Sequence, residues 1–311
     1  RLVEETGEGI VVSGARMLAT LGSLAEEILV IPSTVLKEEP AARPFALAFA
    51  LNCNAPGLKF ICRDAFDNGR SRFDAPLSSR FEEMDCVAVF DGVTVPWERV
   101  FLCGDVARCN ALYAETGAVV NMMHQVVVKN AVKAEFVLGL AAKIAEISDA
   151  MSLPHVRDRL AEMIITAELM RSCLRAAEAD AAADKWGEFM PARPPLDVAR
   201  NLFPRLYPRM IEIIQLNSSS SLMATPSEAD FNSPLLPDIE RYLATSGAPA
   251  RDRVALYRLA WDVAGSAFGG RQVLYERFFF GDPVRMASAL VDNTDLRPLI
   301  RRIDDFLKRP D

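Results

Sequence analysis

One short segment near the C-terminal end combines residue types that suit the binding of a flat ring. Residues 265–283 read GSAFGGRQVLYERFFFGDP. Arg271 supplies hydrogen-bond donors, and three consecutive phenylalanines, Phe278–Phe280, supply aromatic surface. The Gly281-Asp282 pair that follows is expected to expose backbone N–H groups in a turn. The pattern is typical of a ring-binding segment, in which aromatic side chains contact the ring and backbone N–H groups in the following turn bind it. It is equally typical of a turn that closes a hydrophobic core.

Two segments nearer the N-terminus place hydroxyl groups where a ligand could reach them. Thr20 ends an apolar stretch beside Gly22, so its hydroxyl and the nearby backbone would suit the polar edge of a ring. Ser33 and Thr34 follow Pro32 at the start of a polar segment, which would suit a lid over a binding site. A threonine at a strand end and a solvated hairpin loop explain the same residues without any ligand.

Four serines in a row, Ser218–Ser221, follow the apolar stripe of an expected helix. Small side chains with hydroxyl groups permit the close approach of a phosphate or of another chain. A polar helix end accounts for the run equally well.

Several enzyme classes lack their motifs in this sequence. The glycines of residues 265–272 follow an expected helix instead of a strand, so they do not form a dinucleotide-binding fingerprint. No Walker loop, HExxH or GxSxG occurs, and neither His124 nor His155 lies near a suggestive serine. The six cysteines form no CxxC pair, so we expect free thiols in a cytoplasmic protein and no metal site.

Charge and hydropathy argue against two kinds of partner. The net charge of −7 is the wrong sign for a nucleic-acid-binding protein. No apolar run reaches the roughly 18 residues that a membrane-spanning helix needs. We therefore expect neither a nucleic acid nor a membrane as a partner.

The first third of the sequence predicts β structure. Residues 1 to about 105 contain short apolar runs bounded by glycine, proline and serine. Asp91-Gly92 stands between two such runs and predicts a two-residue hairpin turn, because type I′ turns need positive φ. Several strands at short spacing suggest a barrel or a sandwich.

The remainder predicts helices. An apolar stripe with steps of 4, 3, 4, 3 and 4 residues indicates a helix that packs against others. Further helices are expected over residues 121–150, 194–222 and 250–268, with Pro204 and Pro208 near the start of one of them. The stripe consists of Val156, Leu160, Met163, Ala167, Met170 and Leu174.

This order of elements predicts an α+β protein with two domains. We expect a β-barrel domain over residues 1–106 and a helical bundle over residues 107–311. A cleft between a sheet and a helix bundle is a common place for a planar cofactor.

Three stretches together resemble one enzyme family. They are GEGIVVSGARMLAT, PLSSRFEEMDCVAVFDGVTVPWERV and AWDVAGSAFGGRQVLYERFFFGDPVRM. They are similar to the large, flavin-using oxygenase component of 4-hydroxyphenylacetate 3-monooxygenase and its relatives, which include chlorophenol monooxygenases and the pyoverdine chromophore hydroxylase. The resemblance implies an acyl-CoA-dehydrogenase-like fold, with an N-terminal helical domain, a middle β-barrel and a C-terminal four-helix bundle. It also implies a homotetramer, and it suggests that the first helical domain is absent from this chain.

The resemblance further implies a two-component, FAD-dependent aromatic hydroxylation. A separate NAD(P)H-flavin reductase would supply reduced FAD, which reacts with O2 to form a C4a-hydroperoxide. Its distal oxygen would then pass to the ortho position of a para-substituted phenol. Such chemistry needs a site that excludes water, and the cofactor performs the reactive steps while the protein positions and shields it.

The resemblance assigns roles to particular residues. Thr20 matches a barrel threonine near the flavin ring, and Phe280, Gly281, Asp282 and Pro283 match a flavin-binding turn.

Other expected site residues divide between a lid and the absent segment. Ser33 and Thr34 match lid residues that meet the substrate. The catalytic residues cannot be named, because the arginine, tyrosine and histidine expected to hold the phenol would lie in the absent N-terminal segment.

Two alternatives stay open on the sequence. The same fold serves 4-hydroxybutyryl-CoA dehydratase, which needs an iron–sulfur cluster, but the residue seven positions after His124 is Ala131 where that family has a cysteine. A non-catalytic subunit is the second alternative.

Overall fold

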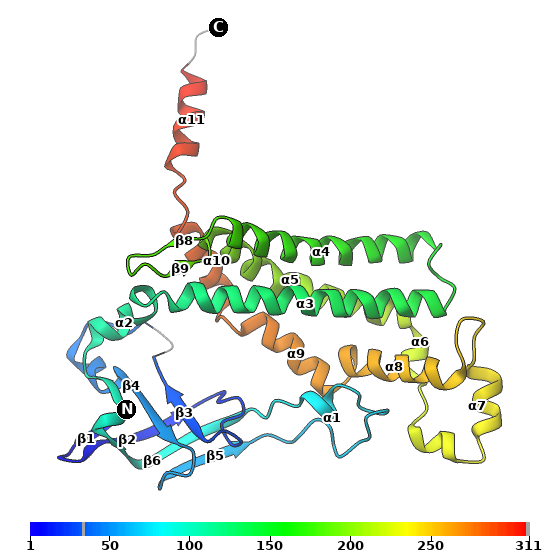
Figure 1. The fold of residues 1–311 in the computed structure, drawn as a ribbon, viewed down its shortest axis with the longest axis horizontal. Helices are drawn as coiled ribbons and strands as arrows, with labels where there is room; N and C mark the ends of the chain where they lie inside the picture. Colours follow the sequence, from blue (N-terminus) through cyan, green and yellow to red (C-terminus); the bar gives the residue numbers. More distant parts are fainter. Residues whose placement is uncertain (33–34, 309–311) are drawn as a thin grey trace. The chain divides into compact units, whose positions relative to one another are not determined.

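The computed structural model describes residues 1–32 and 35–308, and it confirms the α+β class with strands before helices (Figure 1). The chain divides into two compact units. One consists of Arg1–Arg70 with Leu77–Val119, and the other of Ser71–Pro76 with Val120–Asp311. The expected domain boundary after residue 106 stays a prediction.

The first unit contains two antiparallel sheets. In the larger sheet the strands follow the order β1-β2-β6-β5 (Figure 1). In the smaller sheet the order is β3-β4-β7. The larger sheet contains β1 (Leu2–Glu5), β2 (Gly9–Arg16), β5 (Leu58–Cys62) and β6 (Cys86–Pro96). The smaller contains β3 (Glu27–Val30), β4 (Leu47–Asn52) and β7 (Val100–Cys103).

Both sheets contribute to a single core. Alternate residues of β2 and β6, such as Ile10, Val93 and Val95, are fully buried, as the two-residue period of a strand requires. Leu47 and Phe49 of β4 join them from the other sheet. The β structure expected as a barrel therefore takes the form of two sheets around one core.

Asp91-Gly92 does not form the expected hairpin turn. Both residues lie inside the continuous strand β6, where they form a bulge opposite Ser13 of β2. Gly92 has a φ of +65°, and its N–H donates to Ser13 Oγ at 3.0 Å. The sequence signal for positive φ was right, but a bulge uses that conformation as readily as a hairpin does.

Short elements connect the strands and end the first unit. They are η1 (Pro40–Phe45), α1 (Ser78–Phe81), η2 (Trp97–Arg99) and α2 (Val106–Glu115). Asp105 caps α2 by accepting a hydrogen bond from the N–H of Arg108.

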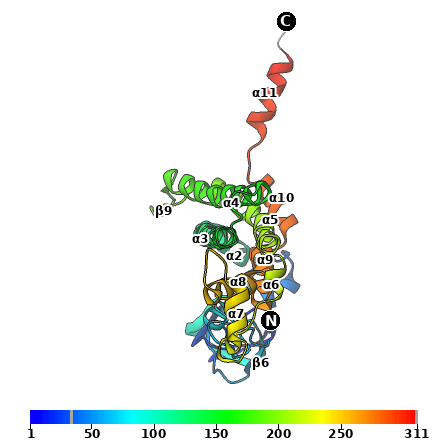
Figure 2. The same ribbon diagram turned by 90° about the vertical axis from the view of Figure 1, so that its right-hand side faces the viewer.

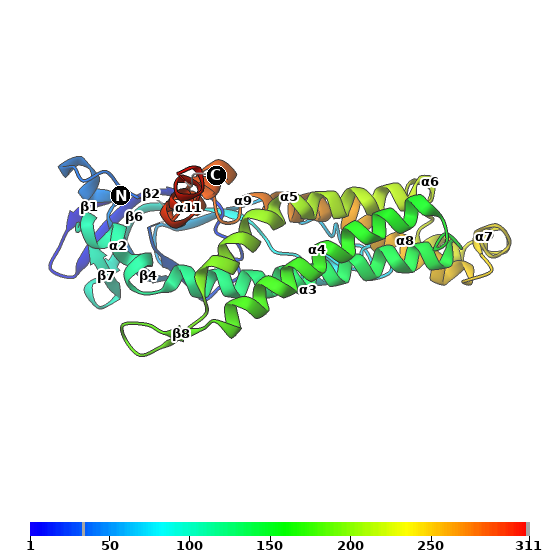
Figure 3. The ribbon, with the colours of Figure 1, turned by 90° about the horizontal axis from the view of Figure 1, so that it is seen from above.

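The second unit is built on long helices. α4 packs on α5, and α5 packs in turn on α8 and α9 (Figure 3), while α3 runs beside α4 (Figures 1 and 2). The longer helices are α3 (Ala118–Ile147), α4 (Pro154–Ala179), α5 (Arg193–Ser218), α8 (Ala250–Ala264), α9 (Ala267–Phe278), α10 (Pro283–Asp292) and α11 (Arg297–Leu307). The shorter elements are β8 (Ala182–Ala183), β9 (Phe189–Met190), α6 (Ser220–Met223), η3 (Glu228–Asn232) and α7 (Leu236–Leu243).

The predicted apolar stripe is the buried face of α4. Val156, Leu160, Met163, Ala167 and Met170 are all buried, whereas Leu174, the last position of the predicted stripe, is only half-buried. The 3.6-residue period of a helix places these positions on one face, which explains why the helix packs there.

Pro204 and Pro208 are not near the start of their helix, as expected, but in the middle of α5. Proline has no backbone N–H, so the carbonyl oxygens four residues earlier, on Arg200 and Pro204, lose their helical donors. The helix continues through both positions, because its apolar residues, including Phe203, Tyr207 and Met210, are held in the core.

No helix in the described part of the chain has the length and apolarity that crossing a membrane would require. The cytoplasmic location expected from the sequence stays a prediction.

Candidate functional site

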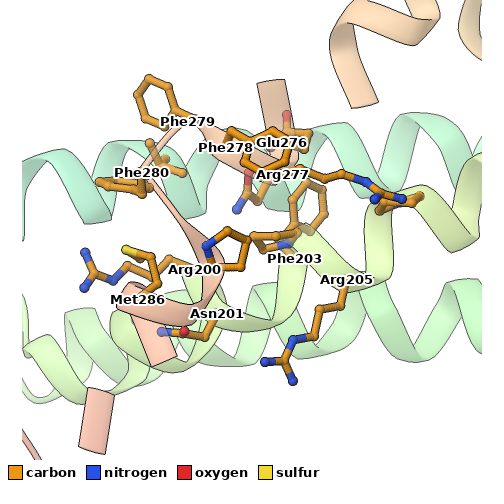
Figure 4. Close-up of a pocket in the computed structure, with 16 residues that line it drawn as sticks. Arg200, Asn201, Phe203, Arg205, Glu276, Arg277, Phe278, Phe279, Phe280 and Met286 are labelled. Atoms are coloured by element: carbon orange, nitrogen blue, oxygen red, sulfur yellow. The ribbon is translucent and has the colours of Figure 1, made fainter. Parts of the chain in front are cut away.

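A cavity of about 270 Å³ lies inside the helical unit. Its walls come from α3, the middle of α5, the end of α9 and the start of α10. Figure 4 shows Phe278 and Glu276 from α9 together with Arg200 and Phe203 from α5 around this space. The volume is near the lower end of the range for small-molecule pockets. It suits one ring system better than a whole dinucleotide.

Three phenylalanines form the aromatic wall of the cavity. Phe278–Phe280 all line it and all keep some exposure to solvent. The Phe279 ring contacts Phe280 edge-on at 5.0 Å and Tyr275 at 4.8 Å between ring centres. The segment therefore borders a hollow and is not sealed inside a core.

The turn after the phenylalanines has a different backbone from the one expected. Gly281 has a φ of +110°, which favours glycine, but its N–H donates to Phe278 O at 2.8 Å and is not free for a ligand. Asp282 caps α10, since Oδ1 accepts from the N–H groups of Val284 and Arg285 at 2.9 and 3.0 Å. The expectation of an exposed N–H is thus wrong for Gly281.

The polar groups on the opposite wall come from α3 and α5. Asn130 is 2% exposed, and its Oδ1 has no hydrogen-bond partner among the described residues. Arg200 is also buried, and its guanidinium lies 2.8 Å from the Asp197 carboxylate and 5.4 Å from the centre of the Phe280 ring. Burial lowers the pKa of Arg200, while the nearby Asp197 carboxylate opposes that shift.

A buried carboxylate joins α3 to α9 at the edge of the cavity. The Glu276 side chain is 3% exposed and accepts from Lys129 Nζ at 2.6 and 2.7 Å and from Lys133 Nζ at 2.6 Å. Lys133 also donates to Gln272 Oε1 at 2.7 Å. Burial, and secondarily the Glu276 charge, raises the pKa of Tyr207 far above its usual value.

Sequence reasoning missed this cluster, although a signal was present. The two lysines are four residues apart on one helix face, and so are Gln272 and Glu276 on another. Arg271, which was expected to supply donors to a ligand, is not in the cavity wall; its guanidinium lies 5.7 Å from the Tyr275 ring centre.

Thr20 belongs to the other unit, in a turn after β2. Its Oγ1 donates to Asp85 Oδ1 at 2.9 Å, and Asp85 Oδ2 accepts from Arg63 Nε at 3.1 Å. Leu18 and Leu21 on either side have φ values of +61° and +60°, a conformation that is unfavourable for leucine. Strained backbone of this kind is concentrated at functional sites. A role of Thr20 in ligand binding stays a prediction.

Two other candidate segments give less information about a ligand. Ser33 and Thr34 lie outside the residues that the structure describes. The serine run spans the end of α5 and the start of α6, and Arg253 Nη2 donates to Ser221 Oγ at 2.9 Å. The run therefore forms a helix end, beside a hollow of about 170 Å³.

Comparison with known families covers nearly the whole chain. The model for the 4-hydroxyphenylacetate 3-hydroxylase C-terminal domain matches residues 109–308, and the model for the N-terminal domain matches residues 1–102. The chain belongs to the 4-hydroxyphenylacetate 3-hydroxylase family. The resemblance seen in the sequence is confirmed.

Two relatives of the hydroxylase family are 50% identical to this chain. They are the 4-hydroxyphenylacetate 3-monooxygenase oxygenase components of Geobacillus sp. and Thermus thermophilus, and each alignment covers 99% of this chain. The chain spans 62% and 63% of these relatives, which is less than two thirds of their length.

Solved structures agree with this assignment. The oxygenase component HpaB complexed with FAD and 4-hydroxyphenylacetate superposes with a TM-score of 0.94 at 50% identity, over 99% of this chain and 64% of that one. A 4-hydroxybutyryl-CoA dehydratase from N. maritimus shares the fold with a TM-score of 0.86, but at 20% identity this shows the fold alone.

Proposed function

We propose that the protein is the oxygenase component of a two-component, flavin-dependent monooxygenase. It would use reduced FAD and O2 to hydroxylate a para-substituted phenol at the ortho position. The observation that carries this proposal is the 50% identity, over 99% of the chain, to a structure that holds FAD and 4-hydroxyphenylacetate.

The cavity in the helical unit fits one ring of the cofactor. Its walls are largely apolar and aromatic, and a few polar groups face it, which is typical of sites for planar cofactors. We assign cofactor contacts to Phe280, Gly281, Asp282 and Pro283, three of which line the cavity directly. Bound reduced flavin supplies the activation of O2 for transfer to an aromatic ring.

The chain's own residues would position the cofactor and exclude water from it. Phe278–Phe280 cover one side of the cavity with apolar surface, which limits access of water to a reactive species. Gly281 with its positive φ allows the sharp turn from α9 into α10. By the family resemblance, Thr20 would contact the flavin ring, and Ser33 and Thr34 would contact the substrate.

Two kinds of partner complete the proposal. A separate NAD(P)H-flavin reductase would supply reduced FAD, as the words "oxygenase component" in the names of the relatives imply for those proteins. The second partner would be further copies of the chain in a homotetramer, and α11, whose apolar residues Ile300, Ile303 and Phe306 are all exposed, offers a surface for a contact between subunits. An exposed apolar helix face of this kind is typical of contacts between subunits.

A reconstitution experiment tests the function. The full-length protein, mixed with chemically reduced FAD and 4-hydroxyphenylacetate in air-saturated buffer, is expected to form the corresponding catechol, measured by liquid chromatography. A control with oxidised FAD and no reductant should form none. Failure to form a catechol from 4-hydroxyphenylacetate and from a panel of other para-substituted phenols would contradict the proposal.

A further inference from the structure

Asn130 is an unusual residue to find in the wall of the cavity. It lies in the middle of α3, is 2% exposed and lines the cavity together with Val126, one turn earlier on the same helix. Its Oδ1 is buried without a hydrogen-bond partner among the described residues. A buried polar atom without a partner destabilises a fold, so its presence in a ligand-sized hollow points to a partner outside the chain.

The wall formed by α5 adds two more acceptors. Pro204 and Pro208 both line the cavity, and each removes the N–H that would have bonded the carbonyl oxygen four residues earlier. Those carbonyls belong to Arg200 and Pro204, which line the same cavity. Two prolines four residues apart in the cavity wall therefore leave two carbonyl oxygens of α5 without their usual helical donors beside the hollow.

Two of the charged groups around the hollow, Arg200 and Glu276, are already paired. Arg200 is held by Asp197 at 2.8 Å, and Glu276 is held by two lysine ammonium groups. The neutral groups that remain for a ligand are the Asn130 amide, the two carbonyls and the aromatic rings, and Arg205 and Arg277 also line the cavity. A flat ligand with N–H donors on one edge fits these neutral groups.

We propose that Asn130 and the carbonyls of Arg200 and Pro204 hydrogen-bond the N–H edge of a planar nitrogen heterocycle that lies against the Phe280 ring. The inference rests on the proposed function, because FAD carries two rings of this kind. The isoalloxazine presents an imide N–H between two carbonyls, and adenine presents an exocyclic amino group beside a ring nitrogen. The Asn130 amide pairs with either edge, since it offers one donor and one acceptor side by side.

Ligand analogues test the proposal on the unaltered full-length protein. Dissociation constants are measured for lumiflavin against 3-methyllumiflavin, and for AMP against its N6,N6-dimethyl derivative. Methylation should weaken binding about tenfold in one of the two pairs, as expected for the loss of one buried hydrogen bond. The pair that is affected shows whether the isoalloxazine or the adenine binds at Asn130. Equal affinities within both pairs, in a protein that binds FAD, would overturn this inference but not the proposed function. A protein that binds FAD in neither redox state would overturn both.

A substitution separates a ligand-binding asparagine from a structural one. Asn130→Leu replaces the unpartnered amide by an apolar group of similar volume, so the Tm without ligand should be unchanged or higher. Its affinity for FAD should fall about tenfold, and the difference between methylated and unmethylated ligands should vanish.

Thr166→Val is the matched control for Asn130→Leu. Thr166 is also a buried polar residue, but its Oγ1 donates to Glu162 O at 2.9 Å, and it lies outside the cavity wall. Thr166→Val should leave the affinity for FAD unchanged. A lower Tm in Asn130→Leu with an unchanged affinity for FAD would show that Asn130 is structural, and the analogue measurements decide the question if the variant does not fold.

Discussion

Glu276 of α9 accepts hydrogen bonds from Lys129 of α3 through both carboxylate oxygens, at 2.6 and 2.7 Å. The pair joins two helices far apart in the sequence, directly beside the aromatic wall of the cavity. Lys133 adds a second cation to the same carboxylate. The position of the end of α9, and with it Phe278–Phe280, therefore depends on one buried acid.

We predict that Glu276→Gln lowers the free energy of unfolding by about 3 kcal/mol, because it removes the buried carboxylate charge that two partly buried ammonium groups share. Urea unfolding of the variant and the parent measures this difference. The matched control is Glu146→Gln, which removes an exposed partner of Lys143 and should change the free energy by less than about 1 kcal/mol. Similar effects of the two substitutions would contradict a stabilising role for the buried cluster.

A second prediction concerns the end of α5. Ser219 has φ +49° and ψ −138°, a region that glycine occupies without strain and serine does not. Ser219→Gly should therefore raise the free energy of unfolding by about 1 kcal/mol. Ser220→Gly, one residue later in a helical conformation, should lower it by roughly 0.5–1 kcal/mol. Thermal unfolding measures both changes. A higher Tm for Ser219→Gly and a lower Tm for Ser220→Gly would support backbone strain at Ser219, and a lower Tm for both variants would contradict it.

A third prediction concerns pH. Both oxygens of Glu162 on α4 accept from Arg209 on α5 at 2.8 Å, and these hydrogen bonds lower the pKa of Glu162. An acid with a lowered pKa stabilises the fold above its unfolded-state pKa, near 4.3, and loses that contribution as the pH falls through the folded-state value. Both side chains are partly exposed, so the pair should stabilise the fold only weakly. At pH 6 the free energy of unfolding of the parent should be about 0.5 kcal/mol higher than that of Glu162→Gln, and at pH 3 the difference should be smaller. A difference that does not change with pH would refute the pairing.

The turn at Thr20 allows a functional prediction. Thr20→Val removes the hydroxyl that is held by Asp85, so a flavin placed against this turn should be misaligned. We expect more H2O2 and less catechol per reduced FAD consumed, measured by a peroxide assay beside product chromatography. Thr20→Ser keeps the hydroxyl and should therefore retain the parent's coupling, meaning the catechol formed per reduced FAD consumed. Thr94→Val on β6 should leave this ratio unchanged. Unaltered coupling in Thr20→Val would remove this residue from the site.

Local sequence patterns were sufficient to predict much of the helical unit. The stripe from Val156 to Met170 predicted the buried face of α4, because a helix period is a property of neighbouring residues. Asp91-Gly92 shows the limit of such signals. The pair correctly indicated positive φ, but the partner strand decides whether that conformation forms a turn or a bulge.

Features that depend on distant residues were not predicted. The two lysines of α3 meet Glu276 only after the chain has folded back, and nothing local to Glu276 indicates its burial. The same holds for the cavity, whose walls join Asn130 to residues more than a hundred positions later. Phe280 and Pro283 were identified as candidates by resemblance, whereas Asn130 could be found only from its missing hydrogen-bond partner.

The most direct test of the proposed function follows the oxygen atom. The full-length protein is supplied with reduced FAD, 4-hydroxyphenylacetate and ¹⁸O₂ in ordinary water, and the product is analysed by mass spectrometry. Our account predicts a catechol in which the new hydroxyl carries ¹⁸O, with none formed when reduced FAD is omitted. A catechol whose new hydroxyl carries oxygen from water, or one that forms without reduced FAD, would contradict it.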